Sequence, residues 1–340
     1  MESISDKDRS ILFLFDSNGD PLGRVEGGAL SGNRVLAESD HVVTAAADSV
    51  TTLSESARSD YDTGQGTYVQ AAAASQTSGA ATFWFDTGLV DGTYKNSYVS
   101  VGNENAVQTG SVAGIVGTTA YCGDRNFAVV RQSFVGTDGN PTRNWLYETT
   151  SDAEPVVRGE WDYDPEFRPV TSVSPCSDDG RYLYTLYASE EAVTANGNGP
   201  GLTLVSIDTE DGTRSETQLD MPGYTWSTHR SSLTVVDNKL YWVTQDEDVL
   251  SVPLDGTNRV EKEWSLPRSD SAVVQVRGRT LSALSNDGTA VFGQFDLASG
   301  VATAEPIALP WLADIEGQPT EGGGTIYKIV DAAAIPAPNR

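Results

Sequence analysis

The feature that most constrains the fold of this chain is a four-strand pattern that can be laid down three times in succession between residues 170 and 310. Short runs of β-branched and aromatic residues alternate with turn residues throughout this region, as is typical of strands. The pattern predicts strands at Val170–Val173, Arg181–Tyr187, Leu202–Ile207 and Arg214–Leu219, then at Ser232–Val236, Lys239–Val243, Val249–Leu254 and Val260–Trp264, and then at Val273–Val276, Thr280–Leu284, Ala290–Phe295 and Val301–Ala304.

A shared turn marks the end of the third strand in each copy. There an apolar residue is followed by Asp208, Asp255 or Asp296 and then by a glycine. Aspartate caps a turn through its own side chain, and glycine takes the positive φ that a hairpin requires. The three aspartates lie 47 and then 41 residues apart, which suits one blade of a β-propeller.

The rest of the chain continues the pattern less clearly. Residues 35–53, 67–107 and 112–161 supply three further copies, and Leu14–Asp16 with Leu22–Val25 match a third and a fourth strand. The two strands missing before them are expected from the C-terminus, around Ile315 and Thr325–Val330. The expected fold is therefore an all-β propeller of seven four-stranded blades whose N-terminal strands complete the last blade, with six or eight blades as alternatives.

Helical periodicity is almost absent, and we expect one domain rather than several. Residues 1–8 are expected to be a disordered N-terminal segment, residues 9–331 a single β-propeller domain, and residues 332–340 a C-terminal tail.

One repeat resembles a known family group. Ser174–Tyr184 (SPCSDDGRYLY) is similar to the turn and second strand of seven-bladed propellers of the YVTN and lactonase-like kind, and Val205–Asp208 with Gly212 continues the match. The match departs from the family by an insertion, Cys176–Asp178, and it covers about 45 residues closely. The resemblance implies a fold and no activity, since propellers host many functions.

The charge composition limits the kinds of molecule that the protein is expected to bind. There are 22 Lys and Arg residues against 48 Asp and Glu, a formal net charge of -26. Such a surface repels nucleic acid and anionic lipid headgroups. We interpret the acidity as a solvated surface, with a halophilic host or cation-binding loops as alternatives. The sequence has no apolar run long enough for a transmembrane helix, so direct membrane insertion is not expected.

The two cysteines and the N-terminal residues indicate the cellular compartment in which the protein works. The first residues, Met1–Ser10, do not have the pattern of a signal peptide, so the protein is either cytoplasmic or begins after a removed signal or anchor. Cys122 and Cys176 both fall between the first and second strands of neighbouring copies, which predicts a disulfide and an extracytoplasmic, secreted or surface-anchored protein. Two unrelated thiols in a cytosolic protein are the alternative.

Catalytic signatures are weak. Only His41 and His229 are present with the two cysteines, too few for a three-histidine or four-cysteine zinc site, so no metal site and no cofactor are expected. The sequence lacks a Gly-x-Ser-x-Gly elbow. Asp16–Asp20 resembles the start of a calcium loop but lacks its later glycine and glutamate, and we interpret it as a hairpin turn.

We expect function at one end of the central channel, where loops from every blade converge. Aromatic residues and arginines, which are enriched at binding hot spots, gather in three connections. The candidate ligand-binding residues are Trp161, Tyr163, Arg168, Tyr224, Trp226, His229, Arg230 and Trp311. Their expected partner is a protein or a glycan, bound by a monomer. The alternatives are a hydrolase or lyase that uses loop carboxylates, and a structural module of a cell-envelope assembly.

Overall fold

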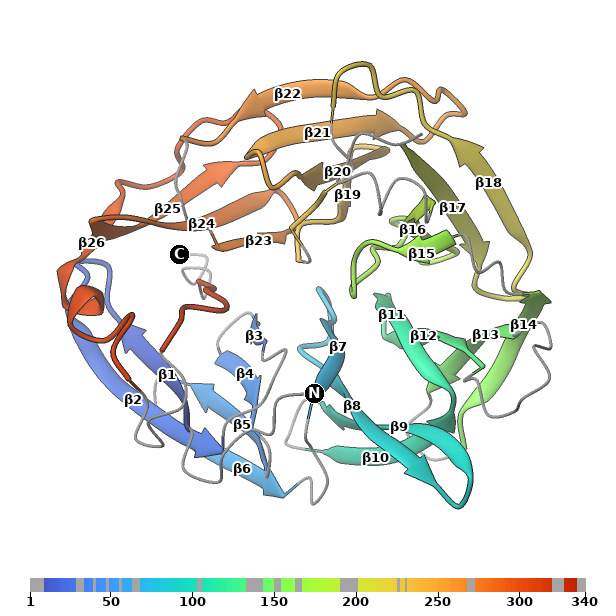
Figure 1. The fold of residues 1–340 in the computed structure, drawn as a ribbon, viewed down its shortest axis with the longest axis horizontal. Coiled ribbons are helices and arrows are strands. Elements are labelled where there is room, and N and C mark those ends of the chain that lie inside the picture. Colours follow the sequence, from blue (N-terminus) through green and yellow to red (C-terminus); the bar gives the residue numbers. More distant parts are fainter. Residues whose placement is uncertain are drawn as a thin grey trace.

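The computed structural model contains six sheets of four antiparallel strands arranged around a central axis (Figure 1). In every sheet each strand pairs with the next in sequence, so the chain runs from the axis to the rim and then crosses to the innermost strand of the following blade. The structure describes residues 9–28, 34–38, 41–46, 49–54, 57–62, 68–102, 106–132, 143–149, 154–162, 167–189, 201–224, 227–229, 231–267, 273–319 and 327–334.

The first three blades follow one another along the chain. From the axis outward, blade 1 contains β3 (Val35–Ala37), β4 (His41–Ala45), β5 (Ser49–Ser54) and β6 (Arg58–Asp62). Blade 2 contains β7 (Val69–Ala74), β8 (Ala81–Val90), β9 (Thr93–Val101) and β10 (Val107–Ala113). Blade 3 contains β11 (Ile115–Cys122), β12 (Arg125–Arg131), β13 (Arg143–Thr149) and β14 (Val156–Asp162).

The last three blades cover the region of the clearest repeat. Blade 4 contains β15 (Phe167–Pro169), β16 (Tyr182–Ser189), β17 (Leu202–Asp208) and β18 (Arg214–Gln218). Blade 5 contains β19 (Thr234–Val236), β20 (Lys239–Val243), β21 (Asp248–Pro253) and β22 (Glu261–Ser265). Blade 6 contains β23 (Val273–Arg277), β24 (Thr280–Asp287), β25 (Thr289–Asp296) and β26 (Ile307–Leu309), followed by a 3-10 turn, η2 (Pro310–Asp314).

The core lies between neighbouring blades. One buried cluster joins Leu202 of blade 4 to Trp242 of blade 5, and another joins Val43 of blade 1 to Phe83 of blade 2. Residues of the middle strands are buried on both faces because each blade has a neighbour on each side. Stacked repeats bury their core in this way, which is why the repeat predicted the fold class.

The expected count of seven blades was wrong, because six four-stranded blades form. The N-terminal strands β1 (Arg9–Phe15) and β2 (Pro21–Gly28) make a separate two-stranded sheet between blade 6 and blade 1 (Figure 1). The strands expected to complete this sheet, around Ile315 and at Thr325–Val330, do not form: Ile315 lies in a turn after η2, Tyr327–Val330 form no strand, and Thr325 and Ile326 lie outside the described residues. The Tyr327 amide donates to the carbonyl of Gln318, and the Tyr327 carbonyl accepts from the amide of Gly317, both at 2.9 Å. Alanine is a poor strand former, and three alanines follow Asp331.

We call β1, β2 and Tyr327–Ala334 together the closure sector, because they fill the space between the last blade and the first. Leu12, Leu14 and Ala333 pack against the buried cluster of blade 1. Phe15, Ile329, Ala332 and Ala334 pack against the buried cluster of blade 6. The sector therefore joins the two blades by apolar packing.

Two further strand ranges were wrong. The first strand of blade 4 was predicted at Val170–Val173, but β15 is Phe167–Pro169. The fourth strand of blade 6 was predicted at Val301–Ala304, but β26 begins after Pro306 and pairs Ile307 with Phe292. Residues 301–304 are exposed, and within them Ala302 makes an isolated bridge to Phe295. An alternating pattern without an apolar face to bury does not fix a strand.

Candidate functional site

The innermost strands are joined to one another along the propeller axis. Between blades 3 and 4, the Thr119 amide donates to the Ser172 carbonyl at 3.2 Å and the Ser174 amide donates to the Thr119 carbonyl at 2.9 Å. Between blades 5 and 6, the Val276 amide donates to the Ser231 carbonyl at 3.1 Å. These backbone bonds hold neighbouring blades in fixed positions at the axis.

Blade 6 reaches blade 1 through side chains instead. Gln275 Nε2 donates to the carbonyl of Val35 at 2.7 Å, and Arg277 Nη1 donates to the carbonyl of Ala37. Arg277 Nη2 also pairs with Glu38 Oε2 at 3.0 Å, and only 1% of Glu38 is exposed. A buried carboxylate needs such a partner, so this pair fixes the innermost strand of blade 1 against that of blade 6.

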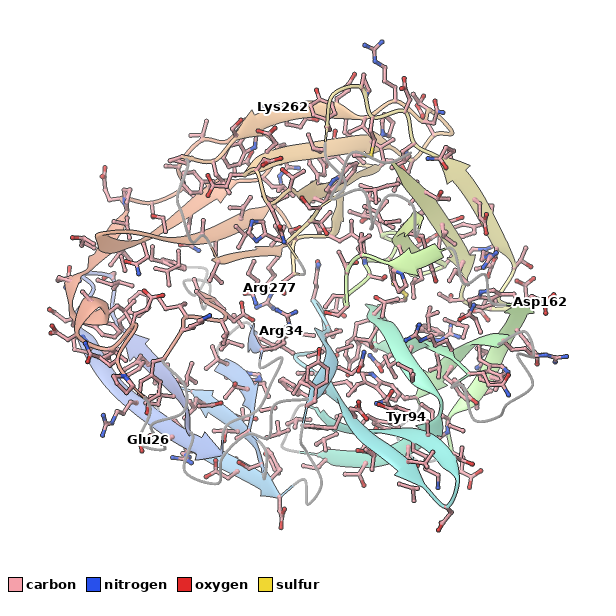
Figure 2. All side chains as sticks on the ribbon, in the orientation of Figure 1. Glu26, Arg34, Tyr94, Asp162, Lys262 and Arg277 are labelled. Carbon is pink, nitrogen blue, oxygen red and sulfur yellow. A yellow bond between two sulfur atoms is a disulfide. The ribbon has the colours of Figure 1, made fainter. Side chains whose placement is uncertain are left out.

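A second arginine extends away from blade 1. Arg34 Nη2 donates to Ser172 Oγ of blade 4 at 3.5 Å, although blades 2 and 3 lie between blades 1 and 4 in the ring. Figure 2 shows Arg34 and Arg277 near the middle of the ring. Arg34 thus links two blades that share no sheet contact, and places a guanidinium group near the axis.

The C-terminal segment contributes a carboxyl group to the same region. Asp331 Oδ2 accepts the amide of Val35 at 3.1 Å, and Oδ1 accepts the amide of Ala332 at 3.0 Å. Burial raises the pKa of Asp331 to about 6, while the nearby charge of Arg34 and the two backbone hydrogen bonds act in the opposite direction. The protonation of this group therefore changes close to neutral pH.

We call Arg34, Glu38, Gln275, Arg277 and Asp331 the axial cluster. It offers two guanidinium groups, one paired carboxylate and one carboxyl group that titrates near pH 6. Guanidinium groups recognise carboxylates, and here the Arg277 guanidinium binds the Glu38 carboxylate and so holds two blades together. Across the described residues, no three His, Cys, Asp or Glu side chains are grouped as metal ligands.

Two of the predicted binding connections enter neighbouring blades. Trp161 lies near the end of β14, and the connection from there leads to β15, the innermost strand of blade 4. The Arg214 guanidinium lies 5.5 Å from the centre of the Trp161 ring. Trp161 Nε1 is buried and has no hydrogen-bond partner in the described part of the chain. Tyr163 lies outside the described residues, and of Arg168 only its place in β15 is described.

The second connection leads from β18 to β19 of blade 5. Tyr224 packs against the buried cluster between blades 4 and 5. The His229 amide donates to the Val243 carbonyl at 2.9 Å, and burial lowers the pKa of the imidazole. His229 Nε2 has no hydrogen-bond partner in the residues described. Trp226 and Arg230 lie outside the described residues.

Trp311 occupies a different place, in η2 beside the closure sector. Its Nε1 donates to the carbonyl of Gly19 at 2.9 Å, and its ring centre lies 5.3 Å from that of Phe13 and 6.4 Å from that of Phe15. The indole thus packs between blade 6 and the N-terminal hairpin. The structure does not bring it together with the other predicted residues, and its role in ligand binding stays a prediction.

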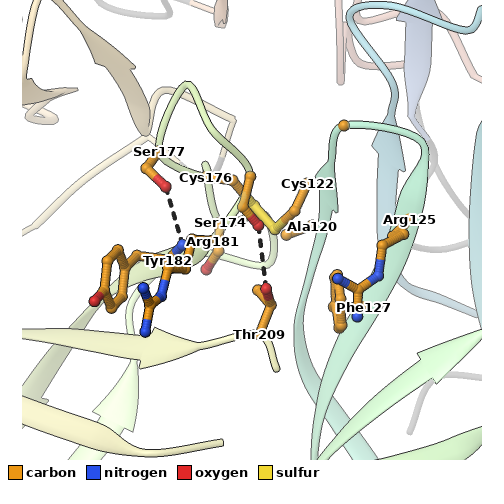
Figure 3. Close-up of a disulfide and its surroundings, with 12 residues drawn as sticks. Ala120, Cys122, Arg125, Phe127, Ser174, Cys176, Ser177, Arg181, Tyr182 and Thr209 are labelled. Carbon is orange, nitrogen blue, oxygen red and sulfur yellow. Dashed lines mark hydrogen bonds between the residues drawn. A yellow bond between two sulfur atoms is a disulfide. The ribbon is translucent and has the colours of Figure 1, made fainter. Parts of the chain in front are cut away.

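The predicted disulfide is present. Cys122 and Cys176 are bonded, with their Cα atoms 5.3 Å apart (Figure 3). Cys122 ends β11, and Cys176 lies between β15 and β16, so the bond joins the first-to-second strand connections of blades 3 and 4. That end of the axis is opposite to the end at which the β14–β15 and β18–β19 connections enter.

None of the residues of the axial cluster is among the candidate binding residues predicted from the sequence. Arg34 directly precedes a predicted strand, Arg277 directly follows one, and Asp331 interrupts an otherwise apolar stretch. A charged residue at the edge of a predicted innermost strand is the signal that was available. This signal alone does not identify the cluster, because the sequence does not tell which innermost strands meet at the axis.

Comparison with known proteins gives only distant likenesses. No protein-family model and no curated protein sequence matches the chain. A prolyl endopeptidase structure is similar over 79% of this chain at 16% identity with a TM-score of 0.48, and the chain spans only 40% of its length. BamB from Moraxella catarrhalis matches 87% of this chain and 74% of its own at 11% identity and a TM-score of 0.45.

A third solved structure is similar over most of both chains. Apo AztD from Citrobacter koseri matches 89% of this chain and 93% of its own at 13% identity, with a TM-score of 0.44. Similarity at this level transfers no function, and the assignment of a propeller rests on the strand topology of this chain itself.

Proposed function

We propose that this protein is an extracytoplasmic binding or scaffold propeller that recognises a protein or glycan ligand at the axial end where the β14–β15 and β18–β19 connections enter. Both connections run from the rim of one blade to the innermost strand of the next. They enter blades 4 and 5, which share a buried cluster. Two aromatic-rich loops therefore approach the same end of the axis from neighbouring blades.

The observation that carries this proposal is the anchoring of the second connection. The Thr228–Thr244 bridge, the His229 amide on Val243 and the Gln245 amide on Ser227 tie the end of the loop to β20 and its continuation. Ser232 Oγ donates to the His229 carbonyl at 2.8 Å. A recognition loop held by a rigid strand loses little conformational freedom on binding, which favours affinity.

The electrostatics support binding more than acid–base catalysis. Among the described carboxyl groups, a raised pKa is resolved for Asp331, and that group is bonded to the backbone of Val35. The other resolved carboxyl shifts are downward, because cations or hydroxyl groups stabilise the charged form, as for Glu148 and Glu263, or because backbone amides do so, as for Asp255. Downward shifts are typical of structural ion pairs.

The compartment is proposed from the disulfide. A bond between two blades persists in an oxidising environment and is rare in the cytosol. The described residues contain no helix that is both long and apolar enough to cross a bilayer.

The test begins with the wild-type protein on a glycan array and on a library of random peptides, followed by titration of the hits. Replacing Trp226 and Arg230 together with alanine is expected to abolish binding of the hits while leaving the melting temperature nearly unchanged. Leu22→Ala is the matched control, since Leu22 is 69% exposed on β2, away from both connections. Equal binding by the double variant would show that the ligand sits elsewhere, and a loss of folding would show that the two side chains belong to the core.

A further inference from the structure

At the axis, the contact between blade 6 and blade 1 differs from the contacts between blades 3 and 4 and between blades 5 and 6. Backbone hydrogen bonds join β11 to the residues after β15, and β23 to Ser231. Between blade 6 and blade 1, the corresponding bonds to Val35 and Ala37 come from side chains, those of Gln275, Arg277 and Asp331. The edge of β3 is thus covered by groups that can be withdrawn without breaking a sheet.

Tyr327–Ala334 lies in the closure sector as an extended segment outside any sheet. Exposure alternates over its first five residues, since Tyr327, Ile329 and Asp331 are half-buried whereas Lys328 and Val330 are exposed, and Ala332–Ala334 are all half-buried. Val330 is 62% exposed, which is unusual for valine in a core. One face of the segment therefore contacts the protein and the other faces away from it, as in a bound peptide.

The contacts of the segment are specific but small. The Asp331 carboxyl group accepts the Val35 amide at 3.1 Å. After it come Ala332 and Ala334 against blade 6 and Ala333 against blade 1. These three side chains are small, and each of them buries little apolar area. The hold on the segment is therefore weaker than that on a strand of a blade.

We propose that the space between blade 6 and blade 1 is a binding site for an extended peptide, and that Tyr327–Ala334 is its exchangeable resident occupant. The site selects an aspartate followed by small apolar residues, because the carboxyl group caps the Val35 amide and alanines fit between the blades. The positions of Lys328 and Val330 accept other residues. A second peptide with this pattern, including the same segment of another copy, takes the site when the resident segment leaves it.

The pH at which exchange occurs follows from the groups around Asp331. Those that the structure places against it are the Arg34 guanidinium, the Val35 amide and the Ala332 amide. Desolvation disfavours the charged form of Asp331 more than the Arg34 charge favours it, so loss of the proton weakens the hold on the segment. Exchange is therefore expected to be faster above about pH 6 than below it.

The experiment uses the full chain and a fluorescent synthetic peptide with the sequence of residues 325–338. Fluorescence anisotropy is expected to show weak binding to the wild-type protein, and binding at least about tenfold tighter to an Asp331→Ala variant, whose resident segment lacks its anchor. Lys328→Ala is the matched control, since Lys328 is exposed in the same segment. It should bind the peptide as the wild-type protein does. A peptide in which the residue equivalent to Asp331 is alanine should not bind.

Hydrogen exchange of the unaltered protein provides a second measurement that does not depend on a variant. The amides of Tyr327–Ala334 and Val35 are expected to exchange together in conditions where the middle strands of the blades stay protected. The proposal is overturned if these amides open only with the blades, or if a folded Asp331→Ala variant fails to bind the peptide.

Discussion

At the scale of single residues, the ion pairs that matter for the fold are those with a buried carboxylate. Glu148 on β13 is 4% exposed and lies between two arginines. Arg125 Nε and Nη2 each donate to it at 2.9 Å from β12, and Arg158 Nε donates at 2.6 Å from β14. Arg125 also pairs with Glu210 of blade 4. One carboxylate thus orders three strands of blade 3, and through Arg125 it connects them to blade 4.

Glu148→Gln is expected to lower the free energy of unfolding by about 2 kcal/mol at neutral pH, since the amide loses the charge that both arginines face. The Arg125 hydrogen bonds and the Arg158 contact hold the pKa of Glu148 below its ordinary value of 4.5. A lowered carboxyl pKa stabilises the fold above the ordinary value, and this stabilisation is lost as the pH falls through the folded value.

Urea unfolding of wild-type and Glu148→Gln proteins should therefore differ most above about pH 5, and the difference should shrink towards pH 3. Glu26→Gln is the control, because the Arg24–Glu26 pair lies on the surface with 43% of the glutamate side chain exposed. It should change stability by less than about 0.5 kcal/mol at either pH. A pH-independent effect of Glu148→Gln would mean that shape, and not charge, is what Glu148 contributes.

At the scale of elements, the turn between the third and fourth strands also forms a contact between blades. Gly212 ends the turn of blade 4 with φ +71°, and a Cβ there would lie 2.3 Å from the Cα of Gly159 on β14 of blade 3. The two backbones approach so closely that neither position has room for a side chain. The glycine that the sequence marked as a turn residue is thus required for packing as well.

Gly212→Ala is expected to destabilise the protein by roughly 2–4 kcal/mol, of which about 1 kcal/mol comes from the positive φ and the rest from overlap with blade 3. Gly256→Ala isolates the first part, because Gly256 holds the equivalent turn of blade 5 with φ +96° and a Cβ there would meet no atom within 4 Å. Thermal unfolding of both variants measures the difference. Equal losses would show that blades 3 and 4 can move apart without cost.

Strands could be predicted from the sequence where the same four-strand pattern recurs from blade to blade. The strands of blade 5 lie within two residues of their predicted ranges, since alternation, aromatic residues and an Asp–Gly turn all agree there. The closure sector was not predictable in the same way. Tyr327–Val330 alternates like a strand, but pairing depends on what the neighbouring chain offers, and Val35 is capped by a side chain. The axial cluster joins residues about 240 to 296 positions apart, a proximity that no local pattern contains.

At the scale of the whole molecule, one covalent bond joins parts of two blades. The Cys122–Cys176 bond closes a loop with a sequence separation of 54 residues, next to the buried cluster of blades 3 and 4. Gly180 of the same connection approaches Cys122 closely, with a Cβ position 3.3 Å from its carbonyl carbon. The backbone at this end of the axis is therefore tightly packed around the disulfide (Figure 3).

Replacing Cys122 and Cys176 together with serine is expected to lower the free energy of unfolding by roughly 4 kcal/mol, because the unfolded chain gains the freedom that the loop had removed. Reduced wild-type protein should unfold at the same urea concentration as the double variant, which serves as the internal control. Thiol titration of unreduced, unfolded protein should detect no free thiol. Two reactive thiols there would contradict both the bond and the proposed compartment.

The arrangement of the closure sector also determines how the molecule should respond to mechanical load. Tyr327–Ala334 is held in that sector by side-chain contacts and small alanines, whereas β1 pairs with β2 along a ladder, so tension applied through the two described ends of the chain acts first on the C-terminal segment. The blades carry that tension only after the sector has parted, because each of them is held by its own strand ladder. The ring should therefore open at one weak seam under low force, and extend blade by blade only at higher force.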